Sequence, residues 1–442
     1  MISLHPNLKK IYVFHFFNNI AISVVANFLF LDRIFLRMGL NMQEFGIIKG
    51  FAYLLPMALN LLVAPYIGRL NRDREIVSIG YFIRVFLPLV FLVIPRFISD
   101  RATLVTAVSL LLITIHIFPI IANNCIQMLV RANVPPDALG THLSWITVIW
   151  TLPGFLLAIP LSWIVDRHTG GTDAEFYRTM FLVMLSTGIF EFVASAIVMR
   201  LPRPESEKRP ELFFRDILLP FKSRNFRRLL GVVLNFSLVN SLIMAFVNPY
   251  LLNVQRLSML FISVVSAVVS LLSILVLPFW GRLADLIGGR NIKKVAVIGL
   301  MIGIAALMGR GIIFIIIYAL FAWEGSRGLF GSGIYSTQQF LVFSLSREDK
   351  RPIFFAASTF AIGAGWFLGS LFGGAVLERL LQIEQFADPM VPYRIYFGIC
   401  TLGALVLAVN TSRLQPDRNR ESMKGIGIAM YRTMRTLFGR VR

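Results

Sequence analysis

Runs of about 20 consecutive apolar residues recur from one end of this 442-residue chain to the other. Each run is long enough to cross the hydrocarbon core of a bilayer as an α-helix. Hydrophobic residues make up 57% of the chain and charged residues 15%, whereas a soluble domain carries about a quarter charged residues. Little chain remains between the runs for a soluble domain. We therefore expect an all-α, polytopic membrane protein.

Proline residues mark or flank the ends of several runs, as expected for a residue that cannot continue a helix. The first run follows Lys9 and Lys10 and lacks a small-residue cleavage site, so we expect an uncleaved helix rather than a signal peptide. Twelve transmembrane helices are predicted, at residues 8–36, 42–67, 76–95, 102–131, 139–165, 177–200, 229–252, 257–280, 294–310, 312–343, 353–377 and 392–411.

The distribution of lysine and arginine predicts the orientation of the chain. With the N-terminus inside, the inner segments carry 30 of the 43 basic residues and the outer segments carry 10. Segments rich in Lys and Arg stay on the cytoplasmic side during insertion, so both termini are expected in the cytoplasm. Because no organelle signal is visible, the bacterial inner membrane is the expected location.

A few charged residues fall inside apolar runs. Lys49 and Arg84 are expected to extend their charged ends to the outer and inner membrane surfaces, respectively. Asp32, near the outer end of the first helix, is expected at the interface or in a vestibule. Glu191, on the sixth helix, has no evident role.

The composition also excludes several functions. The net charge of +20 resides in loops between apolar runs, which reflects membrane orientation and not nucleic-acid binding. Cys125 and Cys400 lie in apolar runs and suggest neither a disulfide framework nor a metal site. The sequence contains no Walker loop, metal-binding His motif or catalytic triad. We expect no enzymatic activity, no cofactor and no bound metal.

The chain divides into two similar halves. We predict a six-helix bundle at 1–200, a cytoplasmic linker at 201–228, a second bundle at 229–412 and a basic cytoplasmic tail at 413–442 that lies on the membrane surface. Residues 126–130 match 338–342 at an offset of 212, and residues 65–70 match 278–283 at an offset of 213. Such near-constant offsets indicate duplication of a six-helix unit, an arrangement known from one transporter architecture above all.

At this point the sequence resembles the major facilitator superfamily over nearly its full length. The family's signature between its second and third helices reads roughly Gly-x-Leu-Ala-Asp-Arg-x-Gly-Arg-(Arg/Lys). The second half approaches this pattern in the segment from Gly281 to Lys294, at Gly281, Leu283, Ala284, Asp285, Gly288 and Arg290. The resemblance implies a 6+6 pseudo-symmetric fold and a cytoplasmic gating loop in which Asp285 sits by the start of the eleventh helix, with Arg282 and Arg290 as partners.

The first-half copy of this loop departs from the pattern. Gly68 and Arg69 fit it, but Arg72 stands where the aspartate belongs and Asp73 comes one residue late. We therefore expect the contacts of the gating loop mainly in the second half of the chain.

The resemblance also implies which helices line the transport path, namely the first, fourth, seventh and tenth. All four carry polar residues on one face, which is unexpected for faces that meet lipid. Hydrogen bonding between packed helices is the alternative explanation for each residue. The candidate coupling and substrate residues are Asn19, Asn27, His116, Asn123, Gln127, Asn240, Glu324, Arg327, Tyr335 and Gln338.

Glu324 and Arg327 are the most informative pair among these candidates. They lie three residues apart within a predicted continuous helix, so they could neutralise each other and brace that helix. Alternatively, Glu324 takes a coupling proton and Arg327 binds an anionic group of the substrate. His116 is a second titratable candidate, and a hydrogen-bonded packing role is its alternative.

These features predict a monomeric secondary active transporter that moves a small organic solute by alternating access, with protons as the coupling ion. Two alternatives stay open. One is a transporter of lipid or lysolipid between leaflets, and the other is a membrane sensor or scaffold that uses the same fold without flux.

Overall fold

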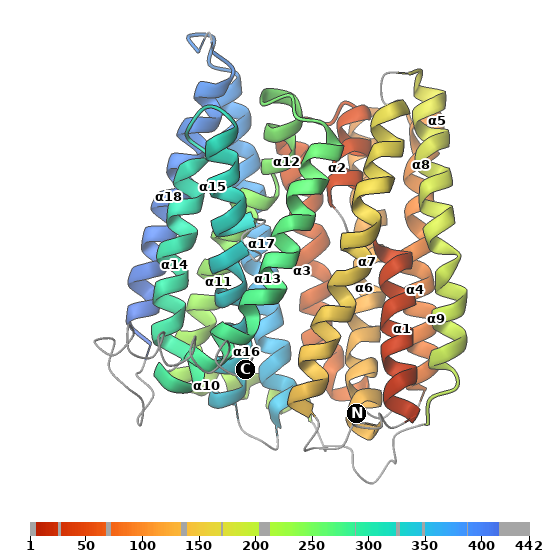
Figure 1. The fold of residues 1–442 in the computed structure, drawn as a ribbon, viewed down its shortest axis with the longest axis vertical. Coiled ribbons are helices and arrows are strands. Elements are labelled where there is room, and N and C mark those ends of the chain that lie inside the picture. The colour runs from red at the N-terminus through yellow and green to blue at the C-terminus, as the bar shows by residue number, and fades with distance from the viewer. Residues whose placement is uncertain are drawn as a thin grey trace, which may run out of the picture. The chain divides into compact units, whose positions relative to one another are not determined.

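A computed structural model describes most of the chain, namely residues 6–24, 28–67, 72–133, 139–168, 171–202, 213–287, 289–323, 328–346, 350–386 and 388–414. All regular secondary structure in these residues is helical, which confirms the predicted fold class (Figure 1). Eight of the described spans are long and apolar enough to cross a membrane. Large apolar side chains such as Leu110, Leu275 and Leu402 are exposed on these helices, as expected for surfaces that face lipid.

Contacts between helices divide the chain into two units. Unit 1 comprises Met1–Asp216 and Asn248–Ala267, and unit 2 comprises Ile217–Val247 and Val268–Arg442. The chain therefore passes between units three times, first within the 3-10 helix η4 (Phe214–Leu218) and then within two further helices. Of these two, the first is the short helix α12 (Val247–Pro249), and the second is the long helix α13 (Met259–Ile287).

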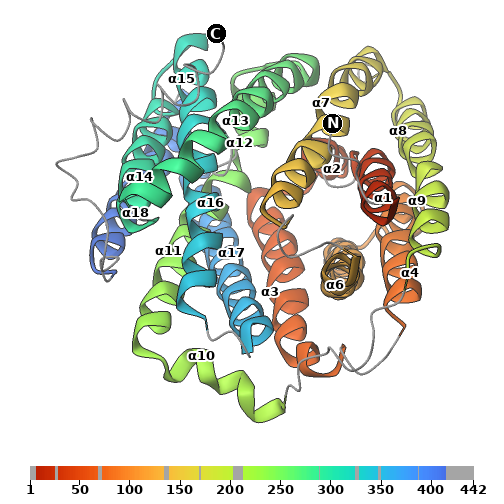
Figure 2. The same cartoon turned by 60° about the horizontal axis from the view of Figure 1, so that its bottom comes forward.

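Unit 1 is built around α6, which packs along α3 on one side and α4 on the other (Figure 2). Helix α1 packs against α9 and α7. The elements of unit 1 before residue 216 are α1 (Pro6–Ile22), α2 (Phe28–Arg37), α3 (Met42–Ile67), α4 (Asp73–Phe86), the 3-10 helix η1 (Leu87–Leu92), α5 (Ile94–Phe97), α6 (Arg101–Asn133), α7 (Leu139–His168), α8 (Asp173–Gly188) and α9 (Phe190–Val198). The π-helix η5 (Tyr250–Val254) also belongs to this unit.

Unit 2 is built around the pair α11 and α17, and α14 packs against α15, α16 and α18. Its elements are α10 (Leu219–Lys222), α11 (Arg224–Met244), α14 (Gly289–Ala306), α15 (Ile312–Ala322), α16 (Gly328–Leu345), α17 (Arg351–Leu381) and α18 (Met390–Ser412). The 3-10 helix η4 (Phe214–Leu218) spans the boundary at which unit 2 begins.

Several of the predicted continuous helices are divided into shorter elements, among them the first and the tenth. The helix predicted at 8–36 is divided into α1 and α2, with a turn at Ser23 and Val24. The helix predicted at 312–343 is divided into α15 and α16. Trp323 leaves the helical region with ψ 124°, and Gly328 has φ +82°, a value that glycine adopts readily. Hydropathy alone does not reveal such breaks, because both halves of each helix are apolar.

The boundary predicted between the eighth and ninth helices is also wrong. The charged segment that begins at Gly281 was expected to be a loop, but α13 continues through it to Ile287, and α14 begins at Gly289. Leu, Ala and Arg favour helix, which explains why charge alone does not end α13.

A conventional N-terminal cap fixes the start of α6. The Asp100 carboxylate accepts hydrogen bonds from the Thr103 backbone N–H at 2.8 Å and from its hydroxyl at 2.6 Å. These two bonds hold the pKa of Asp100 below its usual value. The next residue, Arg101, pairs with Glu44 at the start of α3 at 2.5 Å, so this end of unit 1 is tied across two helices.

Three glycines, each one turn after the last, let α17 approach α11 closely. A Cβ on Gly365 would lie 2.5 Å from the Leu234 carbonyl oxygen of α11, and one on Gly373 would lie 2.9 Å from Leu242 Cδ2 of the same helix. At Gly369 the clash would be with the Leu238 carbonyl oxygen and with Ser241 Oγ. Small residues at this spacing are the usual means of close helix packing in membranes.

This packing gives a direct test of unit 2. Gly369→Ala is expected to lower the free energy of unfolding by about 1–3 kcal/mol, because the new methyl group meets backbone that cannot rotate away. Gly231→Ala on α11 is the matched control, since nothing lies within 4 Å of a Cβ there. The control should stabilise by up to about 1 kcal/mol. Thermal unfolding of the two purified variants measures the difference, and equal melting temperatures would contradict the proposed close packing.

Candidate functional site

Two deeply buried charges in the described residues form an ion pair in unit 1. Lys49 Nζ of α3 lies 2.7 Å from Asp32 Oδ1 of α2, and the two side chains are 1% and 0% exposed. Lys49 Nζ also lies 5.3 Å from the centroid of the Phe45 ring. The expectation that Lys49 extends to the outer surface is therefore wrong, as is an interfacial position for Asp32. Lys49 stood out in the sequence as a charge in an apolar run, but its partner, 17 positions away on another helix, could not be identified.

A residue from much later in the chain completes this pair. Asn248 of α12 donates a hydrogen bond from Nδ2 to Asp32 Oδ2 at 3.1 Å, and its side chain is 3% exposed. Asn248 is the first residue that belongs to unit 1 after the chain leaves α11 of unit 2. The carboxylate thus receives a lysine from α3 and an amide from the segment that follows α11. Three segments, α2, α3 and α12, therefore meet at this carboxylate.

A second buried carboxylate lies on α9 of unit 1. Glu191 is 0% exposed and accepts hydrogen bonds from Asn18 Nδ2 of α1 at 2.9 Å and from Ser195 Oγ at 3.3 Å. The sequence assigned Glu191 no role, because its partner Asn18 is 173 residues away in the chain. The bond from Asn18 ties α1 to α9.

Arg84 lies close to this carboxylate, and His116 lies close to Arg84. Arg84 interacts electrostatically with Glu191 and with the tyrosines Tyr53 and Tyr81. The His116 ring meets the Tyr53 ring edge-on at 5.4 Å, and His116 Nδ1 lies 2.8 Å from the Leu112 carbonyl oxygen. His116 is therefore part of a polar group inside unit 1 rather than an isolated packing residue.

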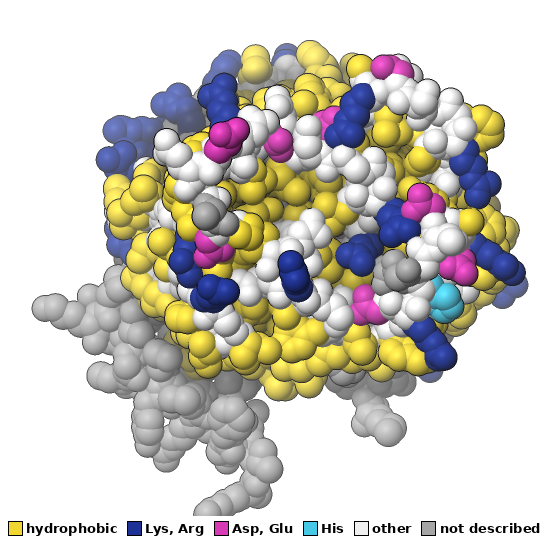
Figure 3. All heavy atoms as spheres, turned by 90° about the horizontal axis from the view of Figure 1, so that it is seen from above, with side chains coloured by type: hydrophobic (Ala, Val, Ile, Leu, Met, Phe, Trp, Pro, Cys, Tyr) yellow, Lys and Arg dark blue, Asp and Glu magenta, His cyan; other side chains and the backbone are white. Residues whose placement is uncertain are grey.

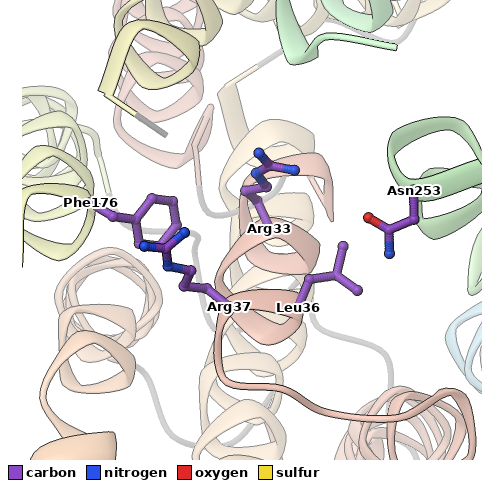
Figure 4. A pocket seen from close by; sticks show the side chains of 5 residues that line it. All are labelled: Arg33, Leu36, Arg37, Phe176 and Asn253. Atoms are coloured by element: carbon purple, nitrogen blue, oxygen red, sulfur yellow. The ribbon is translucent and has the colours of Figure 1, made fainter. Parts of the chain in front are cut away.

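Near the far end of α2 the same unit contains a cavity of about 230 Å³. It is lined by Arg33, Leu36, Arg37, Phe176 and Asn253, from α2, α8 and η5 (Figure 4). Figure 3 views the molecule from this end and shows basic and acidic side chains interspersed over the helix ends.

The predicted gating residues are only partly described. Asp73 is 1% exposed and is the first residue of α4. Gly68, Arg69 and Gly288 lie outside the described residues. Gly281, Arg282 and Asp285 lie within α13, but their side chains are not among those described, so the predicted contacts of Asp285 stay predictions.

Arg290 has a partner that the sequence did not predict. Its Nη2 donates to the Ser412 carbonyl oxygen at the end of α18 at 2.7 Å. In unit 1, Arg74 makes the equivalent contact, because its Nη1 donates to the Met199 and Leu201 carbonyl oxygens at 2.8 and 3.0 Å, just past the end of α9. Each arginine thus neutralises the negative end of the last helix of its own half.

The candidate residues on predicted lining helices fall in different environments. Asn19 Nδ2 donates to the His15 carbonyl oxygen at 2.7 Å, a bond within its own helix, and Asn123 is exposed on α6. Asn240 and Gln338 are 7% and 2% exposed, and their amide oxygens accept no hydrogen bond within the described structure. The candidates outside the described residues are Asn27, Glu324 and Arg327, and the side chains of Gln127 and Tyr335 are likewise not described.

Solved structures with the same arrangement of helices are transporters. The nucleoside transporter NupG is 12% identical, with a TM-score of 0.64 over 93% of this chain and 100% of that one. A bacterial homolog of the human lysosomal transporter Spinster, in an inward-facing and unoccupied conformation, is 14% identical, with a TM-score of 0.64 over 93% and 98%. A D-xylose–proton symporter is 13% identical, with a TM-score of 0.63 over 94% and 98%.

Comparison with curated proteins found no match. The family profile described as Major Facilitator Superfamily matches residues 11–370, which is most of the chain. The family match and the shared fold agree with the eight described spans that are long and apolar enough to cross a membrane. This chain belongs to the major facilitator superfamily and is a membrane transporter.

Proposed function

We propose that this protein is a secondary active transporter that moves a small organic solute by alternating access and is driven by protons. The observation that carries this proposal is the buried pair of Asp32 and Lys49, with Asn248 as the third member. A buried ion pair is costly to assemble and adds little net stability, so its presence within a membrane protein favours a functional role.

The pair offers a direct coupling step. A proton delivered to Asp32 would remove its charge and release Lys49, leaving the lysine uncompensated in an apolar site. The carboxyl would then also hold Asn248 less strongly, since a charged acceptor makes the stronger hydrogen bond. Because α12 connects directly to α11 of unit 2, this release acts on the chain where it passes between units. The protonation state of one carboxylate thereby biases the equilibrium between transport conformations.

Two of the similar structures support a small solute. One is a nucleoside transporter and the other is a sugar–proton symporter. Glu324 and Arg327 remain proposals for a second titratable site. We also propose, from the charge bias of the loops, that both termini are cytoplasmic, which places the cavity at Arg33 and Arg37 on the outer side.

Transport by the reconstituted protein tests this function. Proteoliposomes with an imposed pH gradient are given uridine, D-xylose or benzoate, and uptake is followed together with internal pH. The expected result for one of these compounds is uphill accumulation that is abolished by an uncoupler. Flux that ignores the pH gradient would exclude proton coupling. A protein that carries no compound of the panel would favour the sensor alternative.

The variant that isolates coupling is the double substitution Asp32→Asn with Lys49→Met, which removes both buried charges together and so leaves neither unpaired. We expect it to conduct the solute downhill but to lose proton-driven accumulation. Asp100→Asn is the matched control, because Asp100 is exposed and only caps α6. Normal accumulation by the double variant would show that the pair is structural only.

A further inference from the structure

The cavity at the end of α2 has the chemistry of an anion-binding site. Arg33 and Arg37 are one helical turn apart on α2, and both guanidinium groups line the cavity (Figure 4). Two like charges on adjacent turns repel each other, so their placement together favours a negative ligand between them.

The two arginines differ in how they are held. Arg37 is fixed, because its Nε donates to Asp173 Oδ1 at 2.6 Å, its Nη2 donates to the Gly171 carbonyl oxygen at 3.1 Å, and its guanidinium lies 5.6 Å from the centroid of the Phe176 ring. Arg33 is half-buried and makes no hydrogen bond or ion pair within the described structure. One guanidinium thus forms a rigid wall, and the other retains its donors for a ligand.

The acidic groups near the cavity limit the charge that it can accept. Asp173 is occupied by Arg37. Asp166 interacts electrostatically with Arg33, but its carboxylate accepts hydrogen bonds from the Met259 and Leu260 backbone N–H groups at 3.2 and 2.7 Å and caps α13. The helix N-terminus therefore offsets part of the Asp166 charge. Two arginines and two carboxylates leave little excess positive charge at the cavity, which suits a monoanion better than a dianion.

The opposite wall of the cavity is built from irregular backbone. Asn253 lies within the π-helix η5, a form that is rare and often found at functional sites. Two residues later Arg256 has φ 54°, and no other described non-glycine residue has a positive φ. An ordinary α-helix here would rotate Asn253 to a different direction, so the irregularity places an amide against the cavity opposite the arginines (Figure 4).

We propose that this cavity binds a small organic monocarboxylate, with the carboxylate on Arg33 and Arg37, its apolar part on Phe176 and Leu36, and the Asn253 amide as a further hydrogen-bond donor. The planar guanidinium fork matches a carboxylate, and the Phe176 ring, which is 1% exposed, supplies an apolar wall. The role of this cavity as the first site for a transported solute, on the outer side, rests on the proposed function. Binding itself does not depend on transport.

Binding to the purified full-length protein tests this site without a gradient. Benzoate is titrated by calorimetry, with benzyl alcohol as the neutral compound of similar shape and succinate as the dianion. We expect saturable binding of benzoate, none of benzyl alcohol and weaker binding of succinate. Arg33→Gln should weaken benzoate binding at least tenfold. Arg96→Gln should bind as the wild type does, because Arg96 is an exposed basic residue outside the cavity.

Several results would overturn the proposal. The proposal is wrong if neither benzoate nor succinate binds saturably, or if benzyl alcohol binds as tightly as benzoate. It is also wrong if Arg33→Gln leaves the affinity for benzoate unchanged. Binding that persists in phosphatidylcholine nanodiscs but is lost with phosphatidylglycerol would assign the cavity to a lipid headgroup and also reject it. Benzoate binding without flux in proteoliposomes would contradict the transport function alone. Proton-driven uptake by Arg33→Gln with unchanged KM would contradict the site alone.

Discussion

Asp32→Asn and Lys49→Met, made singly, are each expected to destabilise the protein by about 3–5 kcal/mol, because each leaves the other member buried without its partner. The reason is geometric, since both side chains are at most 1% exposed and neither has access to water. The double variant should regain most of the loss, because it contains no buried charge at this position. The two single variants and the double variant together form a cycle that measures the coupling energy directly.

The control for this cycle is an ion pair at the surface of the same unit. Arg101 and Glu44 are joined at 2.5 Å, but Arg101 is 50% exposed. Glu44→Gln should therefore cost no more than about 1 kcal/mol. Chemical denaturation of the purified variants, followed by tryptophan fluorescence, gives each free energy of unfolding. If the single variants of the buried pair lose no more free energy of unfolding than Glu44→Gln does, the pair is hydrated in solution.

Lys293→Met is expected to stabilise the protein by about 2 kcal/mol or more, because burying an ion costs several kcal/mol unless it is paired. Lys293 lies on α14 of unit 2 and is 0% exposed. Its Nζ has no hydrogen-bond partner within the described structure and lies 5.9 Å from the centroid of the Phe236 ring. Methionine has a similar length and flexibility and fills the same space without a charge.

The neighbouring lysine provides the control for this prediction. Lys294 is only half-buried, so Lys294→Met should change the free energy of unfolding by at most about 0.5 kcal/mol. Thermal unfolding of both variants gives the comparison, and a Lys293→Met protein that melts at or below the wild-type temperature would contradict the assignment of an uncompensated charge. A stabilised variant that transports more slowly would show that the lysine is retained for function.

The regular features of the fold could be predicted from composition and spacing. Apolar runs predicted an all-helical membrane protein, and the resemblance carried by the segment from Gly281 indicated the family, which the family match confirms. Helix interruptions were missed at Ser23 and at Trp323, because hydropathy is the same on both sides of a break. The close packing that begins at Gly365 was visible as three glycines at fixed spacing but was not recognised.

The candidate site was harder to predict, since it depends on which helices are neighbours. His116 was predicted as a candidate and lies beside Arg84 and Tyr53. Glu191 stood out as a charge in an apolar run, but only the packing of α1 against α9 shows that Asn18 satisfies it.

The sequence by itself determined that this chain enters a membrane as helices, because the free energy of inserting each segment depends on its own composition. It also identified charges that fall inside apolar runs, including Lys49 and Glu191. Only the tertiary structure decided how those charges are compensated. Asp32 meets Lys49 from the next helix and Asn248 from beyond α11, and these contacts arise from helix packing, which no local pattern in the sequence records.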